Sequence, residues 1–275
     1  MPEPALAIGE LVERTGVTES TLRMWERRHG FPAPTRLPSG HRRYSDQDVE
    51  LVLQVLRERS AGLSLAAAIA RTRDSDSRVE QSIFAGIRRR RPDLVPLRLR
   101  KPHLLALSRA IEDESCARAE RPLLFASFQR ERFYRQSERR WRDFARTAQA
   151  TVVFADFDDV RISDRAPCEL PIAASEPLSR EWAVVCEATG HAVCLAGVEL
   201  PAERPTRDSA RTFEVIWSVD PTVVRGARDI CVALAGAIAP ELAERFAGRP
   251  AAVPPDQEQL RLAAAITTRT LARLS

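Results

Sequence analysis

Residues 19 to about 28 should form a helix whose exposed side carries groups suited to reading a nucleic-acid groove. Thr18 precedes this segment and is a good N-cap, because its hydroxyl can accept a hydrogen bond from the first turn. Leu22 and one of the pair Met24 and Trp25 are expected to face the core. The remaining side presents the guanidinium and hydroxyl groups that bases and phosphates require. These groups belong to Thr18, Ser20, Thr21, Arg23, Arg27 and Arg28.

A shorter helix should precede this reader helix and hold it in place. Ile8, Leu11 and Val12 share one face at helical spacing, and Gly16 ends the helix. Two short helices joined by a glycine-containing turn form a helix-turn-helix, whose second helix enters the major groove of DNA. The sequence therefore predicts a DNA-reading unit at the N-terminus.

The segment after Gly30 should form a strand, a tight turn and a second strand. Three prolines and a Pro-Ser-Gly sequence interrupt FPAPTRLPSGHRRYS and exclude a helix. The second strand would lie beside the reader helix as a wing, where basic and phenolic groups suit phosphate contact. Those groups belong to His41, Arg42, Arg43 and Tyr44.

At their spacing, these residues resemble the MerR family of winged-helix regulators. That family has a helix, then T-L-R-x-[YW]-E-R, then a wing ending in G-[HY]-R-x-Y. The matching positions here are Thr21, Leu22, Arg23, Trp25, Glu26, Arg27, Arg36, Gly40, His41, Arg42 and Tyr44. The resemblance continues to Arg71, over one helix capped by Ser45 and a shorter one after Gly62. It implies a homodimer on double-stranded DNA that distorts a promoter so that RNA polymerase can engage it.

Basic charge is concentrated in the N-terminal part of the chain. The 275 residues include 42 basic and 38 acidic ones. Residues 1–101 contain 19 basic and 13 acidic residues, a balance of +6, and the remainder contains 23 and 25. The alternative is a helical protein-interaction module whose arginines are merely solvated. That alternative does not explain why a basic reader helix and a basic wing occur together. The absence of an 18-residue apolar run or a leader pattern predicts a cytoplasmic protein without a membrane partner.

We expect four segments along the chain. They are a winged helix-turn-helix domain at 1–72, a linker with a short helix and basic clusters at 73–102, a sensory domain at 103–248 and a C-terminal helix at 249–275. The basic clusters at 88–91 and 98–101 could tether phosphates or simply solubilise the linker. The predicted fold class is α+β, in which a helical N-terminal domain is joined to a domain with a central β-sheet covered by helices.

Apolar runs predict the elements of the second domain. Strands are expected at 123–128, 150–157, 178–187, 192–200 and 211–219, and long helices at 130–148 and 221–246. The FQRERFYRQSERRW helix, VVFADF strand and EWAVVC hairpin resemble the DICT domain, a sensory module found beside diguanylate cyclase and two-component modules. The resemblance implies signal input from an unidentified small-molecule effector.

A ligand in this domain should lie between the sheet and its helices. Candidate walls are Tyr134, Trp141, Trp182 and Trp217, and Arg130 or Arg135 could hold an anion, although each aromatic residue could equally belong to the core. The WERRHGFPxPxR stretch also resembles light-sensing MerR regulators that bind cobalamin. Those regulators need a D-x-H-x-x-G loop, which none of the four histidines provides, so we expect no cobalamin.

No compact catalytic or metal-binding group is evident. Five cysteines without a C-x-x-C pair are expected to be small core residues, although Cys186 and Cys194 could meet across a hairpin. Phosphate-loop, nucleophile-elbow and H-E-x-x-H motifs are absent, and Asp156 and Asp158 at a strand end are typical turn formers. We therefore expect no enzyme activity, no metal and no resident cofactor.

The last helix carries apolar or small residues at four-then-three spacing, which is typical of a coiled-coil seam. They are Leu260, Ala264, Thr267, Leu271 and Leu274. Two heptads are marginal alone, so the helix should dock on its own domain or on a partner chain. The leading hypothesis is a regulator of transcription. The alternatives are an architectural DNA binder whose second domain recruits a protein, and an enzyme on a DNA tether.

Overall fold

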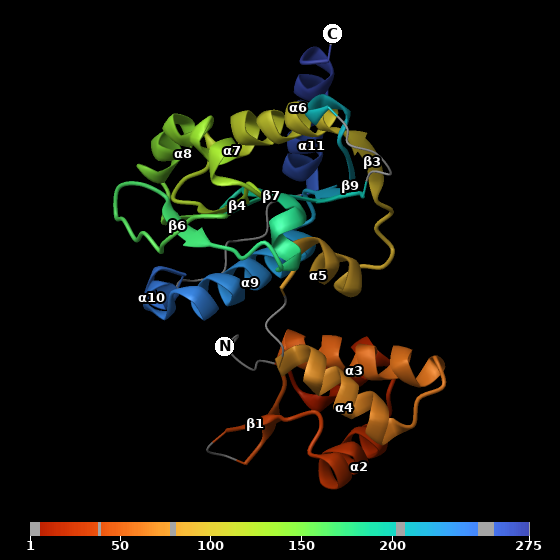
Figure 1. Cartoon of the computed structure of the whole chain (residues 1–275). Coiled ribbons are helices and arrows are strands. Elements are labelled where there is room, and N and C mark those ends of the chain that lie inside the picture. The colour runs from red at the N-terminus through yellow and green to blue at the C-terminus, as the bar shows by residue number, and fades with distance from the viewer. Residues whose placement is uncertain (1–5, 38–39, 78–80, 202–206, 247–255, 275) are drawn as a thin grey trace. The chain divides into compact units, whose positions relative to one another are not determined.

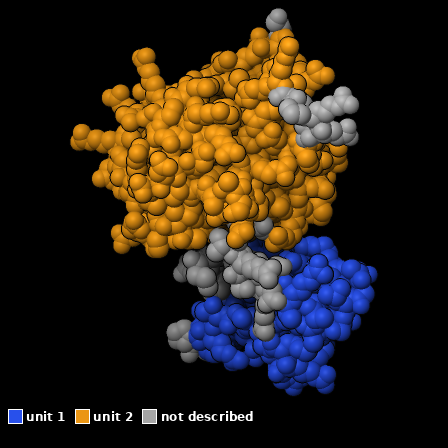
Figure 2. Space-filling model, in the orientation of Figure 1, with its two compact units in different colours: residues 1–78 blue, residues 79–275 orange. Residues whose placement is uncertain are grey.

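Two compact units make up the chain, residues 1–78 and residues 79–275 (Figure 2). The computed structural model describes residues 6–37, 40–77, 81–201, 207–246 and 256–274. Each unit buries its own hydrophobic residues, as independent domains do. No helix among these residues is both long and apolar enough to cross a membrane.

Unit 1 is helical and carries a short wing. Its elements are α1 (Ile8–Thr15), α2 (Glu19–His29), β1 (Thr35–Arg36), β2 (Arg42–Arg43), α3 (Asp46–Ser60) and α4 (Leu65–Ser77). Gly16 ends α1 at φ 71° and Gly30 ends α2 at φ 62°, left-handed values that glycine adopts without the clash of a Cβ atom. The strands β1 and β2 pair antiparallel. The predicted helix-turn-helix and wing are therefore both present.

The core of unit 1 fixes the orientation of α2. Leu22 and Trp25 are each only 1 % exposed, and they pack with Leu11 of α1 and Val52 of α3. Trp25 is thus the buried member of the pair that the sequence left open, and Met24 packs at the edge of the core. With this side buried, the opposite side of α2 faces solvent.

Unit 2 is built on one mixed sheet of seven strands in the order β3-β9-β8-β7-β4-β5-β6. The strands β4, β5 and β6 run parallel, and the other neighbours pair antiparallel. The bounds are β3 (Leu97–Arg100), β4 (Leu123–Ser127), β5 (Ala150–Ala155), β6 (Cys168–Pro171), β7 (Glu181–Ala188), β8 (His191–Glu199) and β9 (Thr212–Ser218).

Helices cover both faces of this sheet and make three layers (Figure 1). One face packs against α5 (Ile83–Arg90), α9 (Pro221–Ile238) and α10 (Ala243–Phe246). The other packs against α6 (Lys101–Ile111), α7 (Glu131–Arg135), α8 (Glu138–Ala145) and α11 (Asp256–Ala272). The predicted α+β class is confirmed.

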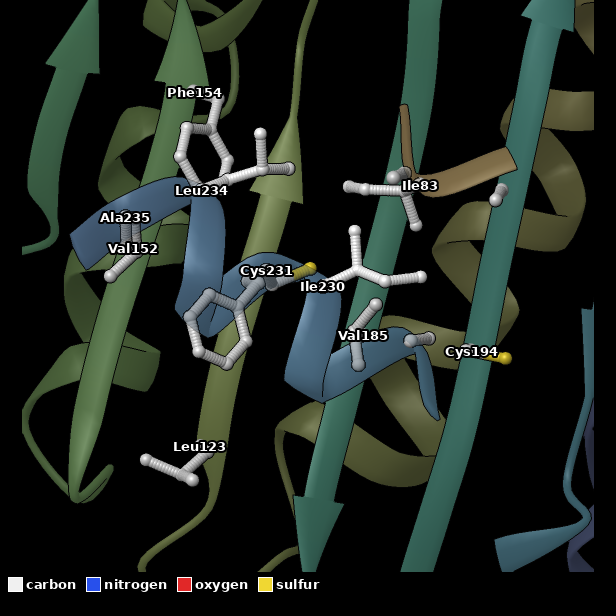
Figure 3. Packing of buried hydrophobic residues seen from close by; sticks show 14 of the residues in the cluster. Ile83, Leu123, Val152, Phe154, Val185, Cys194, Ile230, Cys231, Leu234 and Ala235 are labelled. Atoms are coloured by element: carbon white, nitrogen blue, oxygen red, sulfur yellow. The ribbon is translucent and has the colours of Figure 1, made fainter. Parts of the chain in front are cut away.

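Side chains alternate between these two faces along each strand. Val152 and Phe154 of β5 lie in one core with Leu234 and Ala235 of α9 (Figure 3), whereas Val153 lies in the core on the other face. Because both faces are covered, the central strands are apolar at most positions on both faces, which is why they occur as long apolar runs in the sequence.

Two predicted helices are interrupted. The segment 130–148 forms α7 and α8, which are separated at Gln136 and Ser137; the Ser137 N–H bonds to the Tyr134 carbonyl in a tight i→i+3 turn. The helix after Asp220 ends at Ile238, because Pro240 has no N–H with which to continue the helical ladder. Phe246 then lies on the separate helix α10.

Much of the segment expected to be a linker is folded. The helix α4 extends to Ser77, residues 78–80 lie outside the described part, and Ile83 and Ile87 of α5 are buried beneath the sheet. The strand β3 pairs with β9 along its whole length. These short elements bury their apolar surface against distant parts of the chain. Their local sequence therefore carries little apolar periodicity, which is why it was predicted to be a linker. Three arginines of the first basic cluster make internal contacts, since Arg88 donates to the Leu94 carbonyl, Arg90 donates to the Gly226 carbonyl and Arg91 pairs with Asp220.

The two cysteines of the hairpin do not meet. Cys186 pairs with Val193, and Cys194 pairs with Val185, so the two residues are offset by one position. An offset of one position places the side chains on opposite faces of the sheet, and each thiol lies in a different core. All five cysteines are free and buried.

Candidate nucleic-acid interface and effector site

A cluster of hydroxyl groups marks the start of α2. The Thr18 hydroxyl accepts the Thr21 N–H at 3.3 Å and lies 3.1 Å from the Ser20 hydroxyl and 2.8 Å from that of Thr21. Thr18 and Ser20 are exposed, and Thr21 is half-buried. Backbone N–H groups and hydroxyls at a helix start suit a phosphate or a base edge.

The arginines of α2 differ in how firmly they are held. Arg23 pairs with Glu19 one turn earlier, and its side chain is 54 % exposed. Arg27 and Arg28 are exposed, and neither side chain has an ion-pair or hydrogen-bond partner among the described residues. These two guanidinium groups are therefore available to a ligand outside the unit.

Glu26 joins the reader helix to the wing. Arg42 donates its Nε–H to both carboxylate oxygens of Glu26, at 2.8 and 3.2 Å, and Arg36 approaches the same carboxylate at 3.4 Å. Arg42 was expected to contact phosphate. Its Nε–H is instead bound to Glu26, and its side chain is only 29 % exposed, so the structure shows Arg42 as a link between the wing and the reader helix.

The prediction that Tyr44 contacts phosphate is wrong, because Tyr44 is buried. Its side chain is 1 % exposed and belongs to the core of unit 1, and this burial raises the pKa of its phenol. Its backbone forms an isolated bridge with Leu6. Among the other wing residues, Arg36 and His41 are exposed, and the half-buried Arg43 donates to the Arg42 carbonyl at 2.9 Å.

Unit 2 contains a polar hollow where β4 and β8 end. Its volume is about 400 Å³, and it is called here the edge hollow. The lining residues are Gln129, Arg130, Arg132, Phe133, Ala174, Ser179, Arg180, Glu199, Asp208 and Arg211. A wider, more open hollow of about 780 Å³ shares Arg130 and Arg132 with it and is bounded by Asp156. Of the residues that the sequence suggested as ligand-binding, Arg130 lines both hollows and Arg135 lines the wider one. The other residues of the edge hollow come from distant segments with no local motif.

The aromatic residues expected to bind a ligand line neither hollow. Tyr134 and Trp141 are fully buried, and their rings pack on Phe128 at centroid distances of 5.5 and 5.8 Å. Trp182 donates its indole N–H to the Ser108 hydroxyl, and Trp217 packs against the core on β9. The structure therefore places all four aromatic residues in or against the core.

Arg135 is not a spare anion holder either. It makes two hydrogen bonds to Glu169, at 2.6 and 2.8 Å, and two more to Glu131. The hydrogen bonds that Arg135 donates to Glu169, and then those to Glu131, raise its pKa. Four hydrogen bonds to carboxylates leave Arg135 few donors for a ligand.

The described residues contain no group of three or more His, Cys, Asp or Glu side chains arranged to hold a metal ion. Asp156 accepts the N–H of Glu131 and pairs with Arg130 at 3.2 Å, so it fixes the start of α7. Burial raises the pKa of the Cys194 thiol to about 12, which opposes formation of a reactive thiolate at neutral pH.

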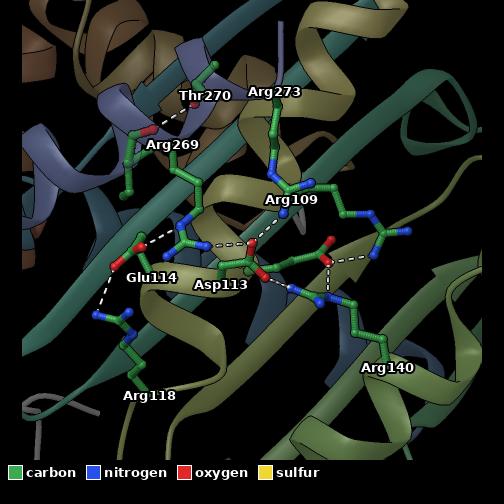
Figure 4. Close-up of polar contacts among 10 residues, drawn as sticks. Arg109, Asp113, Glu114, Arg118, Arg140, Arg269, Thr270 and Arg273 are labelled. Atoms are coloured by element: carbon green, nitrogen blue, oxygen red, sulfur yellow. Dashed lines mark hydrogen bonds and ion pairs between the residues drawn. The ribbon is translucent and has the colours of Figure 1, made fainter. Parts of the chain in front are cut away.

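The C-terminal helix is clamped to its own domain. Ile266 of α11 is fully buried, and Arg269 and Arg273 bind Asp113 and Glu114 (Figure 4). The two acids lie on η1 (Glu112–Cys116), a π-helical turn that continues α6. On the other side of α11, Leu260, Leu271 and Leu274 are 71, 61 and 42 % exposed. The helix therefore docks on its own domain through one side and leaves the predicted seam in solvent.

Together, the fold and the exposed arginines define unit 1 as a winged helix-turn-helix domain, joined to a separate α+β domain. Residues 6–73 match the family described as MerR HTH family regulatory protein. Residues 81–200 match DICT, described as a sensory domain in diguanylate cyclases and two-component system. The chain thus carries a MerR-family helix-turn-helix domain followed by a DICT sensory domain, whose match includes α5 and β3.

Similar proteins include two from Myxococcus xanthus. One is the HTH-type transcriptional repressor CarA, 43 % identical over 75 residues, which are 26 % of each chain. The other is the HTH-type transcriptional repressor CarH, 37 % identical over 68 residues, 25 % of this chain and 23 % of that protein. The mercuric resistance operon regulatory protein of Bacillus cereus is 38 % identical over 58 residues, 21 % of this chain and 44 % of that protein. The chain spans about a quarter of the first two relatives and less than half of the third.

Proposed function

We propose that this protein is a sequence-specific DNA-binding regulator of transcription whose output is controlled by its DICT domain. The observation that carries the proposal is the pair Arg27 and Arg28, which are exposed and unpartnered among the described residues of the reader helix, beside a wing held to that helix by Glu26. Guanidinium groups on a rigid helix suit base edges and phosphates. The similarity to transcriptional repressors over the same residues supports it.

In this proposal α2 enters a major groove and the wing lies on the flanking backbone. Arg23 and Arg27 would read base edges, and Arg28, Arg36, His41 and Arg43 would contact phosphates. Thr18, Ser20 and Thr21 would place the start of α2 against the backbone. Arg42 would act through Glu26, by holding the wing at a fixed angle to the reader helix. The regulator would distort promoter DNA and so alter its engagement by RNA polymerase.

A homodimer would let two reader helices occupy successive major grooves. The exposed seam of α11 suits contact with a second copy of this chain, because Leu260 and Leu274 face solvent on the side away from the buried Ile266. In a parallel pairing of two such seams, Asp256 of one helix falls opposite Arg261 of the other, a favourable g-to-e charge pair. Both of these side chains are exposed.

The test is selection of binding sites from random DNA with the purified full-length protein, followed by fluorescence anisotropy on the selected site. We expect a defined site, bound at least about a thousandfold more tightly than unrelated DNA. Arg27→Ala should relax preference at one base position, whereas Arg139→Ala, an exposed arginine on α8, should bind like the wild type. Equal affinity for all sequences would refute sequence-specific regulation.

A further inference from the structure

The backbone is strained at the end of β4. Gln129 has a φ of 60°, and the Arg130 N–H bonds to the Phe128 carbonyl at 2.6 Å, so Gln129 is the central residue of a γ-turn. This turn is rare for a residue with a side chain and costs free energy, and such strain is found mainly where a backbone shape serves binding. The turn forms part of the wall of the edge hollow.

Side chains hold this turn in place. Gln129 is 3 % exposed; its amide donates to Glu199 at 3.1 Å, and its carbonyl oxygen accepts from Arg211 at 2.6 Å. Arg211 in turn binds Glu199, so the last residue of β8, the residue before β9 and the turn after β4 form a closed network. The wall of the hollow is therefore formed before any ligand arrives.

The acidic groups of the hollow are already neutralised. Hydrogen bonds from Arg211 lower the pKa of Glu199, and hydrogen bonds from Lys101 and Arg211 lower the pKa of Asp208. Both carboxylates are thus ionised at neutral pH and bound to their own cations. They leave little negative charge to compensate the other arginines of the hollow.

Two of those arginines form no ion pair with a carboxylate among the described residues, although Arg180 lies near enough to Glu199 to help lower its pKa. Arg180 donates to the Glu199 carbonyl at 2.7 Å, and the Arg132 guanidinium lies 4.9 Å from the Phe133 ring centre. A third, Arg130, is 48 % exposed and pairs with Asp156 at 3.2 Å. Guanidinium groups from two separate elements, α7 and the turn before β7, thus line one hollow.

We propose that the edge hollow binds a small molecule bearing a phosphate or pyrophosphate group, and that this molecule is the effector of the DICT domain. The role as effector rests on the proposed function in transcription. A tetrahedral phosphate accepts hydrogen bonds from several directions, as arginines on separate elements require, whereas a planar carboxylate matches a single guanidinium fork. A volume of about 400 Å³ fits a small ligand rather than a macromolecule. The location also agrees with the general placement of ligands at the carboxyl ends of parallel strands.

The experiment is isothermal titration of the full-length protein with inorganic pyrophosphate at constant ionic strength. The double variant Arg132→Gln, Arg180→Gln removes both unneutralised charges, and Arg139→Gln removes an exposed arginine from α8 that lines neither hollow. We expect one saturable site in the wild type and in Arg139→Gln, and affinity about tenfold or more weaker in the double variant. Saturable binding that the double variant retains, or no saturable binding, would overturn the proposal.

Two further measurements distinguish failure of the phosphate assignment from failure of the proposed role as effector. Citrate, which carries carboxylates only, should bind more weakly than pyrophosphate; tighter citrate binding would overturn the assignment to phosphate. The double variant should unfold at the same temperature as the wild type in the absence of pyrophosphate, which shows that unit 2 is folded. If the wild type binds pyrophosphate but no specific DNA, the anion site stands and the role as effector fails.

Discussion

Glu26 of the reader helix accepts the Nε–H of Arg42 of the wing at 2.8 Å, and this ion pair joins the two parts of the candidate DNA surface. The carboxylate is 16 % exposed and the arginine 29 %, so the pair is partly shielded from water and from salt. Unlike a fully exposed pair, it can fix the angle between helix and wing. We therefore expect substitution by alanine to change the salt dependence of DNA binding differently at Arg42 and at Arg28.

Arg42→Ala should weaken DNA binding through the position of the wing, and Arg28→Ala through a lost phosphate contact. The slope of log affinity against log salt should fall by about one unit for Arg28→Ala and should stay close to the wild-type slope for Arg42→Ala. Anisotropy titrations at four or more salt concentrations measure both slopes. A fall of about one unit for Arg42→Ala would place its guanidinium on a phosphate instead.

Trp141 should tolerate phenylalanine far better than alanine. Its ring is fully buried, but its indole N–H has no hydrogen-bond partner among the described residues. Trp141→Ala leaves a large cavity and should cost about 3–5 kcal/mol in the free energy of unfolding. Trp141→Phe removes the unsatisfied donor together with some volume and should cost less than about half of that. Urea unfolding curves give both values, and equal costs would contradict this account of the site.

Leu260→Glu should convert a dimer of this chain into a monomer. The side chain is 71 % exposed, so the charge should not disturb the fold of unit 2, but it would lie in the seam between two copies of α11. Val95→Glu is the matched control, because Val95 is 83 % exposed and lies outside α11. Sedimentation velocity reports the mass of each variant. A dimer that persists in Leu260→Glu would exclude this seam as the contact.

Acid should release the clamp on α11. Burial opposes ionisation of Asp113, but hydrogen bonds from Arg140 and Arg273 outweigh it, so the pKa of this carboxyl lies below its ordinary value. A lowered folded-state pKa contributes stability above the unfolded value of about 3.9, and this contribution is lost as the pH falls through the folded pKa.

Thermal unfolding of wild type and Asp113→Asn between pH 7 and pH 3 measures this contribution. The wild type should be the more stable protein at pH 5–7, and the difference should shrink toward pH 3. A difference that stays constant over the whole range would show that ionisation of Asp113 does not stabilise the clamp.

Local sequence determined the structure of the N-terminal DNA-reading unit. The cap at Thr18, the glycine turns at Gly16 and Gly30, and the basic wing depend on residues within a few positions of one another, so spacing alone predicts them. The central strands were predictable for a similar reason, because burial on both faces favours an apolar residue at most positions. The roles of Tyr44 and Arg42 were not predictable, because burial and the choice of ion-pair partner depend on packing.

Tertiary structure decided the rest. The strand β3 and the helix α5 are held by partners far away in the sequence, such as β9 for β3 and Glu181 for α5, and their short sequences carry too little periodicity to be recognised. The edge hollow joins Gln129, Arg180 and Arg211, which no spacing rule connects. The seam of α11 shows both contributions: its periodicity is written in the sequence, whereas the side that faces solvent was set by the clamp between Arg269 and Glu114. Periodicity is a property of one segment, but burial is a property of the two surfaces that meet.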